Sequence, residues 1–352
     1  MKGDVRRMSD IDPLEFLKET KAKIDAYIFD FLPTEHEQPE VRQFYEMMMD
    51  YPRRSGKGLR PAICLLICEA FGGNPQNAFN TAAALELLQN WTLIHDDIED
   101  GSDLRRGEPC LHQKHGIPIS INVGDGLHCK MWEMVHRNAK LLGYELAFEI
   151  ASEFSQLSNH VVAGQHVELS WVNNNCWNLT EEDYWTMCVQ KTAYYTCITP
   201  CRLGGLIAGA TKDQIYPFID IGMNLGVAFQ IQDDVLNLIG EVGQYGKEIA
   251  GDISEGKRTL VLIHLFGTCT KAEALRIIEI MNKPRVDKQP DEIQEVLGLM
   301  EKYESIQYAQ QRSRELAQKA YAKFNREFSY LPGSQAKDIF LQLIHFVIER
   351  EY

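Results

Sequence analysis

The chain has 352 residues, 45% of them hydrophobic and 24% charged, a balance that is ordinary for a globular protein and excludes a disordered or fibrous one. Its formal net charge of −14 opposes nucleic acid binding, which needs a basic surface. The sequence contains no run of about 18 uncharged apolar residues and no apolar core of a signal peptide, so we expect a cytoplasmic protein without a membrane span.

Apolar and small residues recur every three or four positions through most of the chain, the spacing of amphipathic helices. In chain order, the predicted helices lie within Leu14–Phe31, Ala62–Phe71, Ala78–Ile94, Tyr144–Val162, Glu181–Ala210, Ile215–Leu238, Leu260–Met281, Ile306–Phe324 and Ala336–Ile348. Pro200 is expected to kink or break the fifth. Clusters of Gly, Pro and Asn separate the helices, at 72–75, 101–118, 173–175, 240–256 and 282–290.

No convincing run of alternating strand residues is found, so the sequence predicts an all-α fold. None of the breaker segments is long enough to be a linker between domains. We therefore expect a single all-helical domain over residues 1–352, built from roughly ten or more helices. Residues 1–12 could be disordered.

The nine cysteines are scattered, and none has the spacing of a zinc ligand. Cys64 and Cys68, like Cys197 and Cys201, stand four positions apart inside apolar segments, where cysteine usually serves as a small buried hydrophobe. We therefore expect reduced thiols.

Two acidic clusters each end an apolar stretch. Residues 96–100 (DDIED) follow the mostly apolar run 82–94, and residues 233–237 (DDVLN) begin 137 positions later (233 − 96). On a helix, Asp96 and Asp100 lie one turn apart on the same face, with Asp97 beside them. We expect these three carboxylates to face a cavity, where they repel one another unless cations neutralise them. For either cluster alone, a solvated helix face is the competing interpretation.

The residue types of the two clusters indicate a ligand. Carboxylates are hard oxygen ligands, and magnesium is usually held by one or two of them together with waters and substrate phosphates. The paired clusters therefore predict a magnesium diphosphate as the ligand.

Basic residues gather in four islands against the acidic background. These islands are Lys57 with Arg60, Arg105 with Arg106, Lys191 before Thr192, and Lys247 with Lys257 in glycine-containing sequence. Arginine can bind phosphate with two parallel hydrogen bonds, and a lysine on an apolar face needs an anion unless it reaches solvent. The two arginines could instead pair with Asp103 or Glu99. Interleaved with the acidic clusters, the islands favour a site for a diphosphate substrate.

From about Ser55 to Thr259, this ordered set of motifs resembles the trans-isoprenyl diphosphate synthases, the chain-elongating prenyltransferases. Residues 96–100 resemble the first aspartate-rich motif of that family, and Phe229-Gln230 with Asp233-Asp234 resemble the start of the second. The resemblance implies the isoprenoid synthase fold, a helical bundle around a central cavity, and a homodimer. It also implies magnesium as cofactor, about three ions in each active site.

The resemblance further implies a role for each matched residue. The diphosphate of isopentenyl diphosphate would be held by Lys57, Arg60, Gln89 and Arg106. The allylic diphosphate would be held by Arg105, Lys191, Lys247 and Lys257 and bridged by magnesium to Asp96, Asp100 and Asp233. Thr192 and Gln230 would line the place where cationic charge develops, and Asp97 and Asp234 complete the expected catalytic set.

The chain departs from the family pattern at three positions. Asn237 stands where the family often has a third aspartate, which removes a negative charge but keeps an oxygen acceptor and leaves Asp233 as the expected ligand. Gln89 replaces a common histidine and can still donate a hydrogen bond to phosphate. Ser55 replaces a common glycine.

The expected chemistry is ionisation of an allylic diphosphate, assisted by magnesium and the basic residues. The double bond of isopentenyl diphosphate, held beside the cation, then attacks it. Loss of a proton to the released diphosphate completes the condensation. No protein nucleophile is required, and the site must exclude water.

Product length is expected to depend on the depth of the pocket beside residues 82–94. Thr92 lies one turn below Asp96, Trp91 lies at the pocket edge, and Leu88 lies about one turn further down. In the family a bulky residue at either of the first two positions acts as a floor, so Trp91 argues against very long products, unless it is only core packing. The small Thr92 favours geranylgeranyl diphosphate over farnesyl diphosphate.

Two other functions stay open at this point. A class I terpene cyclase also uses aspartate-rich helices and magnesium, but it needs no second set of diphosphate ligands, which Lys57, Arg60 and Arg106 would provide. A non-catalytic partner subunit is expected to lose the aspartates or basic residues that are present here. The sequence therefore favours a prenyltransferase of isoprenoid biosynthesis, also called isoprene biosynthesis, with isopentenyl and allylic diphosphates as its partners.

Overall fold

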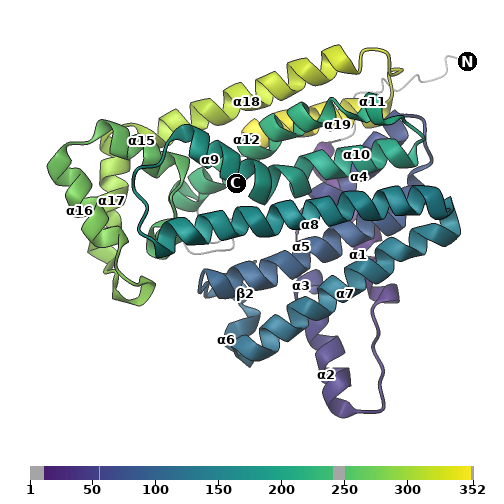
Figure 1. The fold of residues 1–352 in the computed structure, drawn as a ribbon, viewed down its shortest axis with the longest axis horizontal. Helices are drawn as coiled ribbons and strands as arrows, with labels where there is room; N and C mark the ends of the chain where they lie inside the picture. The colour runs from purple at the N-terminus through teal and green to yellow at the C-terminus, as the bar shows by residue number, and fades with distance from the viewer. Residues whose placement is uncertain (1–11, 55, 241–249, 350–352) are drawn as a thin grey trace, which may run out of the picture.

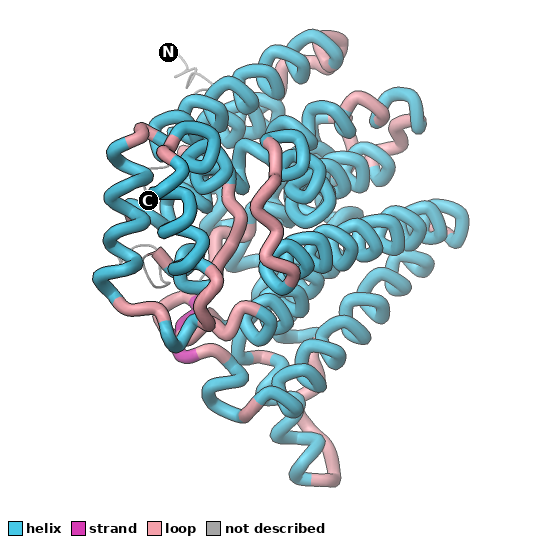
Figure 2. The backbone as a smooth tube through the Cα atoms, turned by 60° about the vertical axis from the view of Figure 1, so that its left-hand side comes forward, coloured by secondary structure: helices cyan, strands magenta, loops and turns pink. Residues whose placement is uncertain are grey.

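The computed structural model describes residues 12–54, 56–240 and 250–349. Long helices packed side by side make up the bundle (Figure 1), and little of the described backbone lies outside them (Figure 2). The predicted all-α class is confirmed, because the described strands are β1 (Leu104–Arg105) and β2 (Glu108–Pro109), a single antiparallel hairpin. Most of the stretch predicted to be disordered, residues 1–11, lies outside the described residues.

The N-terminal half contains α1 (Pro13–Phe31), α2 (Pro39–Met48), α3 (Asp50–Arg53), α4 (Leu59–Ala70), η1 (Pro75–Ala78), α5 (Phe79–Glu99), α6 (Leu111–His115), α7 (Ile117–Leu142) and α8 (Tyr144–Asn173). The C-terminal half contains α9 (Glu181–Cys188), η2 (Val189–Ile198), α10 (Thr199–Ile207), α11 (Lys212–Ile215), α12 (Phe218–Ile239), α14 (Gly251–Glu255), α15 (Leu260–Thr268), α16 (Lys271–Met281), η3 (Arg285–Asp287), α17 (Pro290–Lys302), α18 (Ser305–Glu327) and α19 (Gln335–Glu349). Among the described residues, no helix is both long and apolar enough to cross a membrane.

The largest difference from the sequence prediction is α7, in a stretch to which the apolar pattern assigned no helix. The buried face of α7 includes Ser120, Gly124 and Asn138, which are small or polar, and these positions interrupt the apolar stripe. Contacts with other helices stabilise α7 despite this weak apolar pattern. Gly124 allows α7 to pack closely against α5, because a Cβ at position 124 would lie 2.3 Å from Nε2 of His95. The predicted helix 260–281 is also two helices, α15 and α16.

Pro200 does not interrupt the helical backbone between Glu181 and Ile207. Instead, the turns before it widen into the π-helix η2, whose last amide, from Thr199, donates to the carbonyl of Tyr194 five residues earlier. Proline lacks an N–H and its ring displaces the carbonyl of the preceding turn, so a wider turn before it accommodates the ring. Lys191 and Thr192 lie within this wide segment.

Two clusters of buried apolar side chains form the core. One is built around α1, α5, α7 and α8, and the other around α9, α12, α15 and α18. Helix α4 contributes to both, so it lies between them. All nine cysteines are free in the structure, and the helices bury Cys64, Cys68, Cys197 and Cys201 as predicted.

Candidate active site

A cavity of about 1030 Å³ is lined by the C-terminal parts of α5 and α12. It brings together residues of every motif: Lys57, Arg60, Gln89, Trp91, Thr92, Asp96, Arg105, Arg106, Lys191, Thr192, Gln230, Asp233, Asp234 and Lys257. Of the other predicted site residues, Leu88, Asp97 and Asp100 do not line it, and Lys247 lies outside the described residues, as does Ser55.

The three aspartates of the first cluster have different surroundings at the end of α5. Asp96 faces the cavity, accepts a hydrogen bond from Arg105 Nη2 at 3.1 Å and lies 3.5 Å from Lys191 Nζ. The expectation that Asp97 faces the cavity is wrong. Successive residues of a helix point about 100° apart, and Asp97 is fully buried, where it accepts hydrogen bonds from Arg105 and Tyr51.

Asp100 does not line the cavity either, but its cationic partner does. The Asp100 carboxylate accepts a hydrogen bond of 2.6 Å from Lys257 Nζ, and Lys257 lies 2.8 Å from Glu255 of α14. Burial raises the pKa of Asp100 to about 7, although the Lys257 ammonium acts in the opposite direction. Lys257 and Glu255, which follow the second acidic cluster in the chain, therefore lie beside the first one.

Arg105 and Arg106 lie on the β1–β2 hairpin, whose two-residue turn is made by Arg106 and Gly107, with φ of 55° and 79°. Such turns require positive φ at both positions. Arg54, at the end of α3, holds the hairpin in place by donating to the carbonyl oxygens of Arg105 and Pro109, each at 2.9 Å. The hairpin thereby carries two guanidinium groups to the mouth of the cavity.

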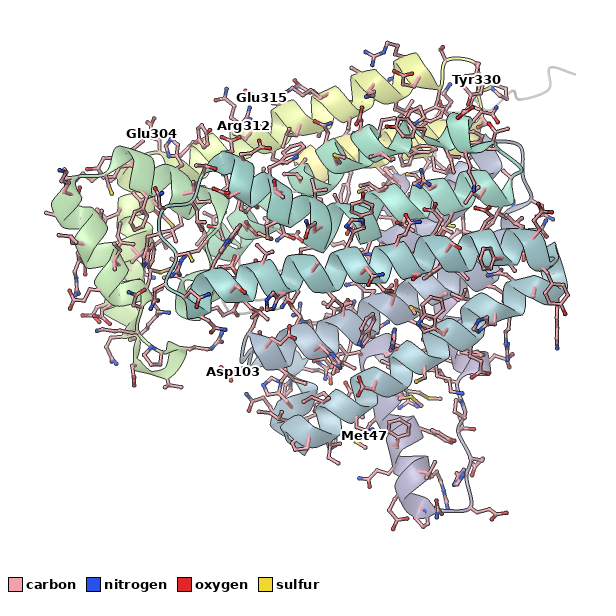
Figure 3. All side chains as sticks on the ribbon, in the orientation of Figure 1. Met47, Asp103, Glu304, Arg312, Glu315 and Tyr330 are labelled. Carbon is pink, nitrogen blue, oxygen red and sulfur yellow. The ribbon has the colours of Figure 1, made fainter. Side chains whose placement is uncertain are left out.

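Arg105 pairs with Asp96 and Asp97 of the first acidic cluster. Asp103 lies at the surface near the hairpin, 3.7 Å from Arg285 (Figure 3). Arg106 turns toward the segment before α4, where a Cβ at Gly56 would lie 2.8 Å from its Nη2. Glycine at position 56 therefore leaves room for the guanidinium.

Arg60 of α4 is a third arginine that lines the cavity, together with Arg105 and Arg106. Its guanidinium stacks 4.0 Å above the ring of Tyr195 and donates to Thr196 Oγ1 at 2.8 Å, so η2 fixes its position. Burial, together with the neighbouring arginines, lowers the pKa of Arg106. Buried cations in such proximity favour an anion between them.

Lys191 reaches the cavity from η2 because α8 packs closely against that helix. A Cβ at Gly164 of α8 would lie 2.3 Å from the backbone nitrogen of Lys191, so only glycine allows this approach. The Lys191 ammonium forms an ion pair with Glu168 of α8. Burial alone would lower the pKa of Lys191, but Glu168 and then Asp96 hold it above its ordinary value.

Glu168 is a site residue that the sequence analysis missed. It lies three positions after Gln165, which lines the cavity and whose Nε2 donates to Glu99 at 2.7 Å. A polar pair spaced by three residues on an otherwise amphipathic helix was the available signal. On its own that spacing is common on solvated helix faces, so it indicated nothing specific.

The second cluster resembles the first only in part. Asp233 and Asp234 both line the cavity from α12, but both carboxylate oxygens of Asp234 accept hydrogen bonds, from Tyr184 Oη at 2.7 Å and Gln230 Nε2 at 2.8 Å. Burial raises the pKa of Asp234 to about 7. Asn237 does not line the cavity, and its Oδ1 accepts a hydrogen bond from the Asp252 amide, so it holds the following loop.

Trp91, the residue predicted to limit product length, lies in the cavity wall. Its ring packs at a tilt against His128 of α7, with ring centroids 4.2 Å apart, and Trp132 Nε1 donates to His128 Nε2 at 3.1 Å. Thr92 also lines the cavity. Leu88 is fully buried in the core, so it does not lie on the cavity surface.

The oxygen donors suit a hard divalent cation. Asp96 and Asp233 present carboxylates to the same cavity from separate helices, with Asp100 behind Lys257. Across residues 12–54, 56–240 and 250–349, no three His, Cys, Asp or Glu side chains are grouped as a preformed metal cage. Magnesium typically binds in such an arrangement, through one or two carboxylates, waters and substrate phosphates.

Comparison with known proteins agrees with this geometry. The family model described as polyprenyl synthetase matches residues 41–300. A geranylgeranyl diphosphate synthase of Saccharolobus solfataricus is 35% identical over 255 residues, 72% of this chain and 75% of that protein. One from Sulfolobus acidocaldarius is 31% identical over 88% of this chain and 92% of its own length. The crystal structure of a geranylgeranyl pyrophosphate synthetase from Pyrococcus horikoshii superimposes with a TM-score of 0.82 at 33% identity, over 96% of this chain and 99% of that one.

Proposed function

The chain belongs to the polyprenyl synthetase family and is a trans-prenyltransferase, and we propose that it condenses isopentenyl diphosphate with an allylic diphosphate to give geranylgeranyl diphosphate. One observation carries the proposal: carboxylates from two helices, Asp96 and Asp233, share a cavity with two separate groups of cations. Two cationic groups suit two diphosphates, which a condensation requires.

The first cationic group lies around the segment that leads into α4. Lys57, Arg60 and Arg106 line the cavity there together with Gln89. The carboxylate of Asp96 pairs with cations of the other group. These four donors line the cavity together, and they would bind the diphosphate of isopentenyl diphosphate.

The second cationic group surrounds the acidic clusters. Arg105, Lys191 and Lys257 contact Asp96 and Asp100, and they would hold the allylic diphosphate as its carbon–oxygen bond breaks. These cations are already fixed by carboxylates, so little reorganisation is needed when charge develops on the leaving group. Thr192 and Gln230 present side-chain oxygens to the place where the allylic cation forms.

Asp96, Asp100 and Asp233 would hold magnesium, about three ions, together with oxygens of the allylic diphosphate. The bound metal would act as a Lewis acid that stabilises negative charge on the diphosphate. Removal of divalent ions with EDTA should therefore abolish turnover. It should also weaken binding of the allylic diphosphate, as measured by calorimetry, about tenfold or more.

Trp91 supports the choice of product. An indole that lines the cavity and is packed from behind by His128 and Trp132 is a rigid obstacle to a growing chain. The small Thr92 beside it leaves more room than a second aromatic side chain would. This combination suits geranylgeranyl diphosphate, with farnesyl diphosphate as the shorter alternative.

We also propose a homodimer through α7 and α8, which pack against each other. Large apolar side chains are exposed on both helices, among them Ile117, Ile121, Leu141, Tyr144, Phe148 and Val162. Exposed apolar side chains gathered on neighbouring helices typically mark a protein interface. A second copy of the chain would cover them.

Product analysis tests the function. The purified chain is incubated with isopentenyl diphosphate, each allylic primer in turn and magnesium, and the products are sized by chromatography. We expect geranylgeranyl diphosphate as the main product. A main product of farnesyl diphosphate would correct the chain length, and no consumption of isopentenyl diphosphate with any primer would reject the proposal.

A further inference from the structure

The two aspartate pairs are built on the same plan. In each pair the first residue, Asp96 or Asp233, lines the cavity. The second, Asp97 or Asp234, is buried and accepts a hydrogen bond from a buried tyrosine of another helix, Tyr51 or Tyr184. Asp234 also forms part of the cavity wall, whereas Asp97 does not. The two tyrosines are 0% and 1% exposed. Neither tyrosine lines the cavity, so neither can touch a substrate.

Tyr51 fixes Asp97 from the side opposite the cavity. The hydroxyl of Tyr51 accepts a hydrogen bond from the Leu111 amide at 3.4 Å, and so its one proton is left for Asp97 Oδ2, 2.5 Å away. Asp97 Oδ1 accepts from Arg105 Nε at 2.8 Å. Asp97 is thereby held between a phenol and a guanidinium.

Asp97, held by Tyr51, in turn orients the guanidinium of Arg105. Asp97 accepts hydrogen bonds from both Nε and Nη2 of Arg105, so the planar guanidinium can present only its remaining N–H groups to the cavity. One of them, on Nη2, donates to Asp96 at 3.1 Å. The orientation of the guanidinium at the cavity mouth therefore depends on Asp97, and through it on Tyr51.

Tyr184 fixes Asp234 in the same way, but with a different result. The Gln230 amide nitrogen donates to Asp234 Oδ1 at 2.8 Å, while Tyr184 donates to the other carboxylate oxygen. The Gln230 carbonyl oxygen then points to Thr192 Oγ1, which donates to it at 2.6 Å. The negative end of the amide dipole is turned toward the cavity, where cationic charge would develop.

We propose that Tyr51 and Tyr184 are positioning residues, each of which fixes the second aspartate of a pair and through it a cavity-facing side chain, Arg105 in one case and Gln230 in the other. The inference rests on the proposed function. It predicts a different effect for each tyrosine. Tyr51 stabilises the bound diphosphate in the ground state, whereas Tyr184 stabilises the transition state.

The test compares Tyr51→Phe and Tyr184→Phe at pH 8, with Tyr308→Phe as the control. Tyr308 of α18 donates to Glu181 of α9 at 2.6 Å, so the control also loses a phenol–carboxylate hydrogen bond, but away from the cavity. Its neighbours Arg312 and Glu315 lie on the outer surface of α18 (Figure 3). All three substitutions keep the ring and remove one hydroxyl.

We expect Tyr51→Phe to raise KM for the allylic diphosphate about tenfold with a smaller change in kcat, the usual size for a lost hydrogen bond to a charged group. Tyr184→Phe should lower kcat about tenfold with KM unchanged. Tyr308→Phe should leave both constants unchanged even if Tm falls. Wild-type kcat and KM in both site variants, or the reverse assignment of the two effects, would overturn the proposal.

Two further measurements keep the proposal testable if a variant folds poorly or the substrate assignment is wrong. Binding of inorganic pyrophosphate, measured by calorimetry, should weaken about tenfold in Tyr51→Phe and stay unchanged in Tyr184→Phe.

Asp97→Asn should raise KM for the allylic diphosphate, as Tyr51→Phe does. The magnesium concentration that gives half-maximal rate should stay unchanged in Asp97→Asn and rise in Asp96→Asn. An equal rise in both would make Asp97 a metal ligand and overturn the inference. If wild-type protein binds pyrophosphate but consumes no isopentenyl diphosphate, the proposed function fails and the binding comparison still tests Tyr51.

Discussion

Lys257 Nζ lies 2.6 Å from Asp100 Oδ2, although 157 positions separate the two residues in the chain. Both side chains are largely buried, with exposures of 13% and 4%. Lys257 also lies 2.8 Å from Glu255, so one ammonium neutralises two carboxylates beside the cavity. Removing it would leave both acids without this cation in a poorly solvated place.

We therefore expect Lys257→Met to lower the free energy of unfolding by about 3 kcal/mol and to reduce turnover strongly. The matched control is Lys302→Met. Lys302 pairs with Glu273 at 2.6 Å in an exposed position, where an ion pair contributes less than about 1 kcal/mol. Urea denaturation of the two variants measures the difference. Equal stability of Lys257→Met and wild type would contradict the argument.

Replacing Trp91 with alanine should lengthen the product by at least one isoprene unit, because the change removes a large ring from the cavity wall. Trp91→Phe, which keeps an aromatic ring, should retain most of the wild-type product. Chromatography of the products decides the matter. An unchanged chain length in Trp91→Ala would mean that the indole only packs the core.

Gly164→Ala should separate α8 from η2 and displace Lys191, since the new Cβ would lie 2.3 Å from a backbone nitrogen. We expect a loss of stability of about 2 kcal/mol and lower turnover. Gly298→Ala in α17 is the control, because a Cβ there meets nothing within 4 Å and alanine should stabilise the helix by about 0.5 to 1 kcal/mol. Thermal unfolding and activity of both variants check this, and a fully active Gly164→Ala protein would refute the close approach.

Phe148→Glu should dissociate the proposed dimer, because it places a charge on the exposed apolar face of α7 and α8. Leu275→Glu on α16 alters an exposed leucine outside that face and should leave the assembly unchanged. Sedimentation equilibrium gives the mass of each variant. A monomeric wild-type protein, or a dimer that persists in Phe148→Glu, would place the interface elsewhere or remove it.

Stability should fall as the pH rises above about 9. Burial raises the pKa of the Cys64, Cys188, Cys197 and Cys201 thiols above the ordinary value of 9.0, to about 12 for Cys197. The folded state then keeps protons that the unfolded state has lost. The stabilisation is complete below about pH 9 and decreases by up to about 1.4 kcal/mol per pH unit for each thiol until the folded pKa is reached.

Urea denaturation between pH 8 and pH 10 under reducing conditions measures this dependence. Cys201→Ala should have a shallower slope than wild type, whereas Cys129→Ala, at an exposed position, should keep the wild-type slope. Identical slopes in all three proteins would show that the buried thiols do not control alkaline stability.

Part of the site was predictable because its acidic and basic residues are clustered over short stretches of the sequence. The two aspartate clusters and the basic islands each occupy a few consecutive positions, so Asp96, Asp233, Lys191 and Lys257 could be named from the sequence. The helical class followed in the same way from local apolar spacing. Where that spacing is interrupted by small or polar residues, as in α7, the local signal failed.

The sequence by itself determined that carboxylates, cations and helices are present, since these are properties of the residues and their near neighbours. Only the tertiary structure decided which aspartate of each pair is held by a tyrosine, and that Asp97 does not line the cavity whereas Asp234 does. That choice depends on Tyr51 and Tyr184, which lie 46 and 50 positions from their partners. Side chains project from all faces of a helix, and the face that is buried is the one that packs against another helix. The local spacing of residues does not encode which face that is.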